Sequence, residues 1–426
     1  MNHDLAMTAE TLAELDAPQR GSEWRQHWPM LLVATAGMML CTVHVYTLGV
    51  MVAPLEREFG WSRTQIFSGP LILALTGLFV TPMIGSLVDR IGPRRVGLIG
   101  VPVFCCSVAL LSTATASPAS WWVLWFVVSL ASILCGPMVW AAGLNSRFVK
   151  NRGLALALAL CGTGAGGAFI PALTEAFIGA LGWRQAYIAI GALAAVITVP
   201  LVLFAFHPLG QAGSVKAMFG KSGGAKRAQG GRSLYFQTRY VKLALAMLLF
   251  GFPVSGVIVN SVPILSSNGF TQASAAALAG VIGIGAIIGR LVGGYLLDRL
   301  NASKVTAVAV MLPAVSGLLL LSGPTSPVTA GAAFMVLGLA VGTELDACAY
   351  LTAQYFGMRN FGALYGMIMG LLVFSNGLSP LIASFIYDKM GSYMPIMWAS
   401  VPCALLSGLL LFSLGKPPAS PDADPV

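Results

Sequence analysis

The chain has 426 residues and a formal net charge of +9; 57% of its residues are hydrophobic, only 9% are charged, and its mean hydropathy is +0.82. A soluble domain carries about 25% charged residues. Because 9% is too few to cover a surface in water, this composition excludes an ordinary soluble domain and predicts a chain that mostly faces lipid.

The start of the chain does not have the pattern of a signal peptide. Residues 1–29 contain five acidic side chains and no apolar core before Met30. A signal peptide has a basic start followed by such a core. We therefore expect 1–29 to be a loose cytoplasmic tail.

The seven cysteines all lie in apolar runs, their number is odd, and no Cys-x-x-Cys motif occurs. Free cysteines in such positions behave as small packing residues. We therefore expect neither a disulfide framework nor a metal site, and no cofactor. No cluster of His, Cys or acidic residues at one depth indicates a membrane enzyme.

Twelve apolar runs have the length of about 20 residues that a helix needs to cross a bilayer. With soft edges they cover 30–53, 66–88, 95–115, 120–144, 153–177, 184–206, 240–263, 275–297, 304–322, 327–350, 361–386 and 393–415. We therefore expect an all-α membrane protein with twelve transmembrane helices.

The longest connection, residues 207–239, separates six runs from six. It is rich in Gly, Lys, Ser and Ala, which is typical of a flexible linker. The expected organisation is a bundle over 30–206, a cytoplasmic linker over 207–239, a second bundle over 240–415, and a cytoplasmic tail over 416–426.

The positions of the basic residues predict the orientation in the membrane. Of the 24 Lys and Arg residues, 19 lie in the tails or in loops after even-numbered spans, and four lie in the opposite loops. Because loops rich in Lys and Arg stay in the cytoplasm, we expect both termini there, in a cell inner membrane. The net charge is thus explained by these loops, and no nucleic-acid partner is expected.

The two halves of the chain repeat each other weakly. Residues 85–95 align with 294–304 at an offset of 209, with Gly, Leu, Asp and Arg recurring in place. Three further pairs of segments match at nearly the same offset: 59–62 with 268–271, 49–52 with 256–259, and 147–162 with 355–370. Parallel repeats of this kind are the layout of one large class of transporters, and we expect two pseudo-symmetric bundles.

Asn301 replaces Gly92 in this repeat. Gly and Asn are the residues that best tolerate the left-handed conformation that ends many helices. We therefore expect Asn301 to take that conformation.

Three stretches resemble the signatures of a known family. Gly85-Ser-Leu-Val-Asp-Arg-Ile-Gly-Pro-Arg-Arg95 resembles the loop after the second span of the major facilitator superfamily. Residues 148–162 resemble the fifth-span signature of its monocarboxylate porters, and 46–63 resemble the first hairpin of their bacterial members. The resemblance covers about residues 30–415. It implies a carrier of small organic anions that works by proton symport or by exchange.

Arg290 is a charge inside a run that is otherwise apolar from 275 to 297. A charge at this depth costs about 2.5–3.5 kcal/mol on insertion scales, so it is usually kept for a function. A guanidinium grips a carboxylate with a planar fork of donors. In the resembling family an eighth-span arginine engages the substrate carboxylate, and Arg290 matches it. The aspartate that animal members carry one turn earlier is Ala286 here, and the alternative role for Arg290 is a structural ion pair with Glu344.

Glu344, Asp346 and His44 are candidates for titrating groups inside the spans. A carboxyl removed from water binds a proton more readily, and a neutral imidazole titrates near physiological pH. Glu344 and His44 are therefore our proton-coupling candidates; an ion pair for Glu344 and a hydrogen bond to a neighbouring helix for His44 are the alternatives. Two positions apart on a helix, Glu344 and Asp346 point about 200° apart, so we do not expect them to share one site.

Three other polar or aromatic side chains are candidate substrate contacts. Asn376 lies near the middle of the eleventh span, where an amide must find a partner. Tyr46 in the first span is either a substrate contact or a packing aromatic. Trp140 in the fourth span either walls a cavity or faces lipid.

Charged side chains at helix ends are assigned to gating. An acid at a helix end can pair with bases of the other half and hold the cytoplasmic side closed until transport breaks the pair. We expect Asp346 to bond to Arg359 or to basic loop residues. The gating candidates are Asp89, Arg90, Arg94, Arg95, Asp298, Arg299, Asp346 and Arg359.

These observations predict a carrier that moves an organic monocarboxylate, with aromatic and hydroxy acids among the candidates, by alternating access. Proton symport is favoured over anion exchange because titrating groups are available. Efflux of a drug or metabolite is the second hypothesis, and a transporter-like sensor is the third. The expected partners are the organic anion, protons and the lipid bilayer, and we expect a monomer.

Overall fold

The computed structural model describes residues 20–148, 151–207, 235–323, 326–415 and 417, without the side chains of 20–22, 82, 89, 358 and 359. Within these residues the regular structure is helical and contains no strand. The helices that precede the linker are α2 (Arg20–Leu40), α3 (Val43–Phe59), α4 (Arg63–Ile66), α5 (Ser68–Ile91), α6 (Pro93–Leu110), the 3-10 helix η1 (Leu111–Thr113), α7 (Pro118–Leu134), α8 (Pro137–Asn145), α9 (Arg152–Leu181) and α10 (Trp183–Ala205). Those that follow it are α12 (Thr238–Val259), α13 (Ser261–Ser267), α14 (Gln272–Arg299), α15 (Ala302–Leu321), α16 (Pro327–Met390) and α17 (Met394–Phe412).

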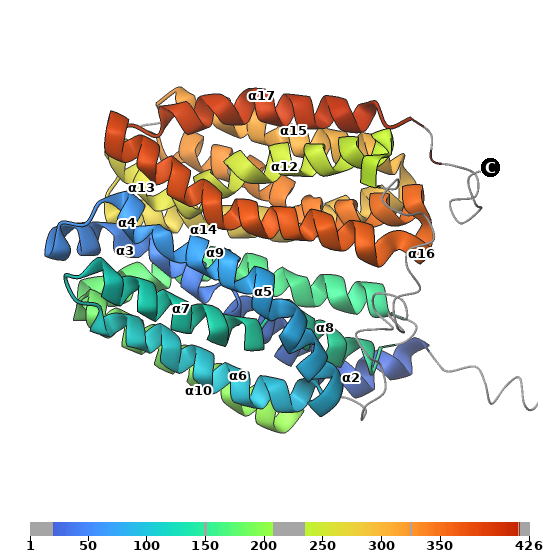
Figure 1. Cartoon of the computed structure of the whole chain (residues 1–426), viewed down its shortest axis with the longest axis horizontal. Coiled ribbons are helices and arrows are strands. Elements are labelled where there is room, and N and C mark those ends of the chain that lie inside the picture. The colour runs from blue at the N-terminus through green and yellow to red at the C-terminus, as the bar shows by residue number, and fades with distance from the viewer. Residues whose placement is uncertain (1–19, 149–150, 208–234, 324–325, 416, 418–426) are drawn as a thin grey trace, which may run out of the picture.

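Twelve helical segments are long and apolar enough to cross a membrane. Each overlaps one of the twelve apolar runs, so the predicted number of transmembrane helices is confirmed. Two of the segments lie in α16, where Gly357 takes φ 71° and separates Pro327–Gly357 from Asn360–Met390. Figure 1 shows the long helices running roughly parallel through the molecule.

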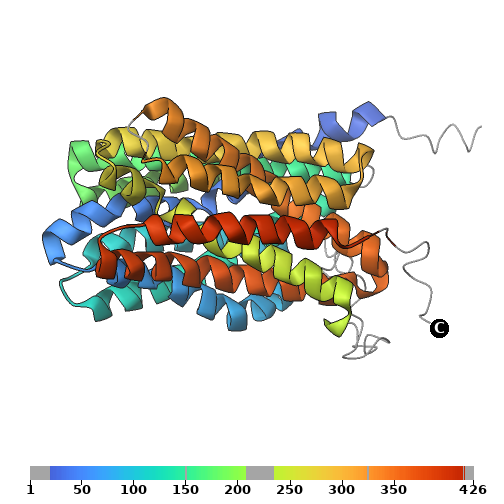
Figure 2. The same cartoon turned by 90° about the horizontal axis from the view of Figure 1, so that it is seen from above.

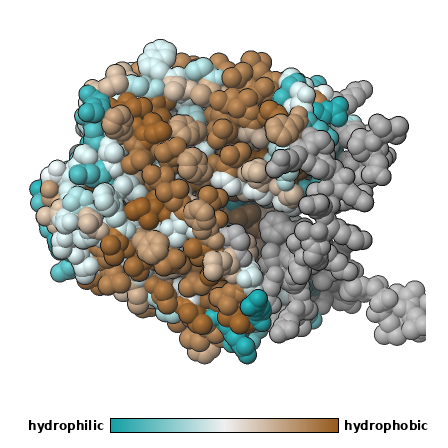
Figure 3. Space-filling view, in the orientation of Figure 1, coloured by the Kyte–Doolittle hydropathy of each residue, from teal (hydrophilic) through white to brown (hydrophobic). Residues whose placement is uncertain are grey.

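Large apolar side chains lie open on the outside of the helices. Phe204 is 79% exposed and Val196 is 72% exposed. Figure 3 shows a hydrophobic surface between hydrophilic areas near the ends of the molecule. Exposed apolar area of this extent is expected of a surface in contact with lipid and not of a surface in water. The chain is therefore a multi-pass membrane protein.

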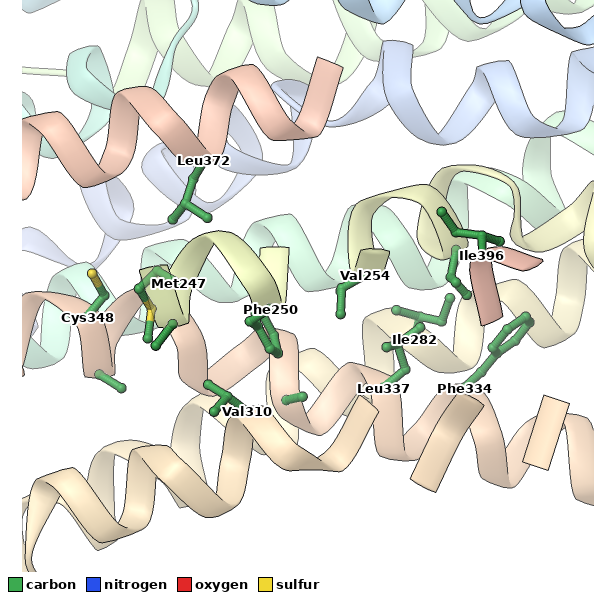
Figure 4. Packing of buried hydrophobic residues seen from close by; sticks show 14 of the residues in the cluster. Met247, Phe250, Val254, Ile282, Val310, Phe334, Leu337, Cys348, Leu372 and Ile396 are labelled. Carbon is green, nitrogen blue, oxygen red and sulfur yellow. The ribbon is translucent and has the colours of Figure 1, made fainter. Parts of the chain in front are cut away.

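The interior has two main hydrophobic clusters. One consists of buried side chains between residues 30 and 206 together with Val259, and the other of side chains between 240 and 414 together with Val50. Figure 4 shows the second cluster, in which Phe250 of α12, Ile282 of α14 and Val310 of α15 lie among side chains of α16 and α17. The fold is thus the predicted arrangement of two six-helix bundles.

The predicted boundaries differ from the helix ends at two places. The last ten residues of the predicted tail 1–29 belong to α2, because the helix starts at Arg20, ahead of the apolar run. The predicted linker 207–239 and tail 416–426 lie mostly outside the described residues, and α12 starts at Thr238.

The repeated loop ends differently in its two copies. Gly92 has φ 85° and ψ 152° and precedes Pro93, the first residue of α6. Asn301 has φ −65°, and its side chain accepts a hydrogen bond from the backbone N–H of Lys304 at 3.2 Å. The expectation of a left-handed Asn301 is therefore wrong. Asparagine serves here as the N-cap of α15, a role in which its side-chain oxygen satisfies a helix N–H.

The most extensive contacts between the two bundles are those of α14 with α9 and of α16 with α5. They also meet at the end that carries α4 and α13, where the side-chain amide of Gln272 donates to the carbonyl of Val50 at 3.0 Å. Figures 1 and 2 show this end opposite the described ends of the chain, so we call it the far end.

A glycine sets the distance between α14 and α9. A Cβ at Gly283 would lie 2.2 Å from the carbonyl oxygen of Gly164 and 2.2 Å from the backbone nitrogen of Ala168. Small residues allow helix backbones in a membrane to approach this closely. Any side chain at position 283 must therefore move one bundle relative to the other.

We predict that Gly283→Ala destabilises the packing of α14 on α9 by about 1–3 kcal/mol, the usual cost of overpacking. The matched control is Gly294→Ala in the same helix, where an added Cβ meets nothing within 4 Å. Thermal unfolding of the purified protein in detergent micelles should show a lower midpoint for Gly283→Ala only. Equal midpoints for the two variants would contradict the close approach.

Candidate functional site

Arg290 lies on α14 where this helix faces both α9 and α16. It is only 6% exposed. The backbone of α16 comes close at this point, because a Cβ on Gly342 would lie 2.8 Å from the backbone nitrogen of Arg290. One turn further along α16, an acidic side chain lies next to the guanidinium.

That acidic side chain is Asp346. Its Oδ2 lies 3.2 Å from Nε of Arg290, and the two side chains are 29% and 6% exposed. Nε is enclosed and has no aligned hydrogen-bond acceptor. Among the described residues no hydrogen bond to the two Nη atoms is found. The ion pair therefore leaves the outer fork of the guanidinium available to a second carboxylate.

The partner of Asp346 differs from the expected one. The sequence predicts a bond to Arg359 or to a basic loop residue; the structure pairs Asp346 with Arg290, and the side chain of Arg359 lies outside the described part. The reason is the close approach of α16 to α14, which no pattern in the sequence records. The predicted alternative partner of Arg290, Glu344, is not its ion-pair partner.

Glu344 points to another side of α16. Its Oε1 lies 3.8 Å from the position that a Cβ of Gly251 in α12 would take. The two acids of α16 thus diverge as their spacing predicts. Glu344 is within the longer electrostatic range of Arg290, but the ion pair of Arg290 is with Asp346.

Groups from both bundles lie within electrostatic range of Arg290. Tyr46 of α3 and Cys161 of α9 lie within its electrostatic range from the first bundle. Tyr365 of α16 does so from the second bundle and also interacts with both acids. The hydroxyl of Tyr46 lies 2.9 Å from the position that a Cβ of Gly167 would take, so this tyrosine covers α9 near the guanidinium.

Tyr365 and Cys161 were not among the predicted site residues. Tyr365 is four residues after Phe361, with which it stacks at 5.0 Å between ring centres. Aromatic residues at that spacing occur on many helices that only pack, so the sequence offers no signal that separates them. Only the packing of the spans brings them to Arg290.

Trp140 is not at the site. It is fully buried, its indole N–H donates to the carbonyl of Cys135 at 2.8 Å, and its ring packs on Phe206. A Cβ at Gly37 would lie 2.2 Å from the indole. The structure therefore contradicts both positions expected for Trp140, at a cavity wall or in lipid, because Gly37 opens a space for it inside the first bundle.

His44 is enclosed in the first bundle between aromatic rings. It is 5% exposed, and Phe104 and Trp125 lie edge-on to its ring at 5.6 and 6.1 Å between ring centres. Its Nδ1 has no hydrogen-bond partner in the described part of the chain. The expected hydrogen bond of His44 to a neighbouring helix is not found among the described residues, and neither is a contact with Arg290.

Asn376 is exposed in the middle of the second segment of α16, Asn360–Met390, although the residue after it packs against α5. Its backbone carbonyl accepts a hydrogen bond from the Ser255 hydroxyl at 3.4 Å. An exposed amide at mid-membrane depth is expected to face water or another polar group. Its role as a substrate contact stays a prediction.

Apart from Asp346, which pairs with Arg290, the predicted gate residues lie at the end of the molecule near the described chain ends. Arg90, Arg95, Asp298 and Arg299 are exposed there. Arg94 donates to the carbonyl of Leu203 at 3.0 Å within its own bundle, and Arg299 lies 4.5 Å from the ring of Tyr295. The side chain of Asp89 lies outside the described part. Among the side chains that are described, no ion pair joins the bundles at this end.

A membrane protein of two repeated six-helix bundles, with one buried cation where they meet, has the architecture of a secondary transporter. The model of the Major Facilitator Superfamily matches residues 31–371, and the chain belongs to this family. It is therefore a membrane transporter and not an enzyme.

Three relatives are similar to the chain in sequence. The gallate transporter of Pseudomonas putida is 25% identical over 414 residues, which cover 85% of this chain and 91% of that protein. The 3-(3-hydroxy-phenyl)propionate transporter of Escherichia coli is 28% identical over 372 residues, which cover 84% and 85%. Human monocarboxylate transporter 11 is 26% identical over 301 residues, which cover 67% and 61%.

The solved structure of the nucleoside transporter NupG is similar in fold. It has a TM-score of 0.72 and 11% sequence identity, and the match covers 91% of this chain and 99% of that chain. At this identity the likeness concerns the fold alone.

We predict that Arg290 and Asp346 are energetically coupled. Asp346→Asn leaves a buried cation without its counter-ion and should destabilise the protein by about 1–3 kcal/mol. In the double variant with Arg290→Gln, the combined loss should be smaller than the sum of the single losses by about 1 kcal/mol or more. The free energies of unfolding of the two single variants and of the double variant are measured in mixed micelles. Arg290→Gln combined with Asp298→Asn, an exposed acid, is the control and should be additive.

Proposed function

We propose that the protein carries a small organic monocarboxylate across the membrane, an aromatic acid first, and that Arg290 binds its carboxylate. The observation that carries this proposal is the enclosed guanidinium between the bundles, whose Nη atoms are not hydrogen-bonded among the described residues. A carboxylate fits this fork with two parallel hydrogen bonds. In a site of low dielectric such a pairing is strong and selects anions.

The substrate class is supported by the surroundings of Arg290 and by the relatives. Tyr46 and Tyr365 bring two rings and two hydroxyl groups within range of the cation. Such side chains can pack on an aromatic ring and hydrogen-bond to its hydroxyl groups. Two of the relatives are named as transporters of gallate and of 3-(3-hydroxy-phenyl)propionate, which are hydroxylated aromatic acids. We place Asn376 on the same substrate path.

Alternating access supplies the transport step in this proposal. The bundles rock about the site, and the charged helix ends with Asp298 and Arg299 close the side near the described chain ends. The excess of basic residues in the tails and in the loops on that side supports its assignment to the cytoplasm. We assign the protein, as a monomer, to a cell inner membrane.

Proton symport follows from the competition for Arg290. When a substrate carboxylate binds the guanidinium, it balances the positive charge of Arg290 in place of Asp346. A carboxylate that loses its cation in a low-dielectric site binds a proton more readily. Asp346 is therefore the proposed proton carrier, with Glu344 as the second acid near the same cation. We do not propose His44 as a proton carrier, because it is enclosed among aromatic rings.

Arg290→Ala tests the substrate site. We expect at least a tenfold loss in the affinity for gallate and for 3-(3-hydroxyphenyl)propionate, because about 1.4 kcal/mol or more of charge-assisted hydrogen bonding is removed. Binding to purified protein is measured by calorimetry, and uptake in proteoliposomes. Arg25→Ala, an exposed arginine of α2 to which the proposal gives no role, is the control. Unchanged affinity in a folded Arg290→Ala variant would refute the anion site.

Asp346→Asn tests the coupling. In the unaltered protein an inward proton gradient should accelerate uptake of the acid, and a protonophore should remove that acceleration. The variant cannot release and bind the proton, so its uptake should no longer respond to the gradient while exchange of labelled for unlabelled substrate continues. If the unaltered protein responds only to substrate on the opposite side and never to the gradient, it is an exchanger and the symport proposal fails.

A further inference from the structure

At the far end a carboxylate of one bundle caps a helix of the other. Asp388, in the last turn of α16, accepts hydrogen bonds from the backbone N–H groups of Arg63 at 3.1 Å and Thr64 at 2.8 Å. The hydroxyl of Thr64 donates to the same carboxylate at 2.5 Å. The first N–H groups of a helix have no partner within the helix, and its start carries a partial positive charge. Ser62 caps the N–H of Gln65 from within the first bundle, and Asp388 satisfies the N–H groups of the two residues before it.

Arg63 reaches in the opposite direction across the same contact. Its Nε is held by Glu56 of its own bundle at 2.8 Å. Its Nη1 donates to the hydroxyl of Tyr393 at 2.9 Å, and its Cζ lies 3.7 Å from the ring centre of Tyr387. The cation is thus fixed on one side by an acid and stacked on the other side against the second bundle.

The contact continues into the interior of the second bundle. The hydroxyl of Tyr393 donates to the side-chain oxygen of Asn260 at 3.1 Å, and Ser384 donates to the same oxygen at 3.2 Å. Asn260 is fully buried and separates α12 from α13. The position of Arg63 is therefore coupled to the break in the seventh span.

The internal repeat does not duplicate this contact. At the offset of 209, Arg63 corresponds to Gln272, and Asp388 corresponds to Gly179. Gln272 still crosses to the other bundle through the carbonyl of Val50. However, position 179 has no side chain that can cap the start of α14. The carboxylate contact is built on one side only.

We propose that Asp388 and Arg63 form a latch that holds the far end closed. The latch consists of the Asp388 cap on α4 and the Arg63 stack on Tyr387 and Tyr393. It joins the bundles where the substrate is not bound, so it sets the balance between the closed and the open far end whatever the substrate is. The charged helix ends near Asp298 form no comparable contact between the bundles among the described side chains. The far-end latch is therefore the stronger of the two contacts that could hold an end closed.

The test measures the opening of the far end directly. Spin labels are placed at Ser117 and Val328, exposed positions at the far end on the first and second bundles, in a variant whose seven cysteines are replaced. Electron-electron distance measurements give the populations of the closed and the open far end. Asp388→Ala should raise the ratio of open to closed about three- to thirtyfold, the usual effect of losing a helix cap. Arg63→Gln should act in the same direction.

Lys389→Gln is the matched control, because the ammonium of this exposed neighbour of Asp388 lies 5.9 Å from the ring centre of Phe385 on its own helix and forms no ion pair among the described residues. It should keep the distribution of the unaltered protein. Thr64→Val removes one of the three hydrogen bonds and should give a smaller shift than Asp388→Ala. Should Asp388→Ala fail to fold, Thr64→Val decides. Distances that stay unchanged in the folded variants would overturn the latch, and no substrate is needed for either result.

Discussion

The fold is arranged around a cation that the membrane interior does not tolerate unpaired. Removing a guanidinium from water costs several kcal/mol, and a nearby carboxylate offsets this cost only when the geometry is good. Asp346 balances the charge of Arg290 through Nε at 3.2 Å without an aligned hydrogen bond. A pair of this kind stabilises the empty site and remains open to competition from an incoming carboxylate. The poor alignment of the Arg290–Asp346 pair limits its contribution to stability. In a transporter, the same poor alignment allows the substrate to replace Asp346 on Arg290.

The packing of the helices around the Arg290–Asp346 pair explains how Arg290 can interact with both bundles. α14 packs closely on α16 within its own bundle and on α9 of the other. Glycines at positions 342 and 283 permit both approaches. Arg290 therefore lies where a relative movement of the bundles changes its surroundings first. Because packed interfaces switch between discrete arrangements, the exchange of partners on Arg290 and the movement of the bundles are physically linked in our proposal.

The two ends of the molecule differ in how the bundles are joined. At the far end, Asp388 and Arg63 connect the bundles through directed hydrogen bonds and ring stacking. At the other end, the repeated Asp-Arg motif presents exposed charges without an ion pair between the bundles in the described part. The internal repeat relates the two bundles to each other and not the two ends of the molecule. At the far end the acid at position 388 has no counterpart in the first half, where Gly179 stands, so this contact is built in one direction only.

The sequence by itself determined the twelve spans, the two bundles and the burial of Arg290, because hydrophobic length and an isolated charge act locally along the chain. It also gave the divergence of Glu344 and Asp346, which follows from helix geometry. Only the tertiary structure decided that Asp346 pairs with Arg290, that Trp140 and His44 lie in the core of the first bundle, and that Asp388 caps a helix 324 residues away. These outcomes depend on which helix faces approach each other, and that is set by packing between spans that no single span encodes.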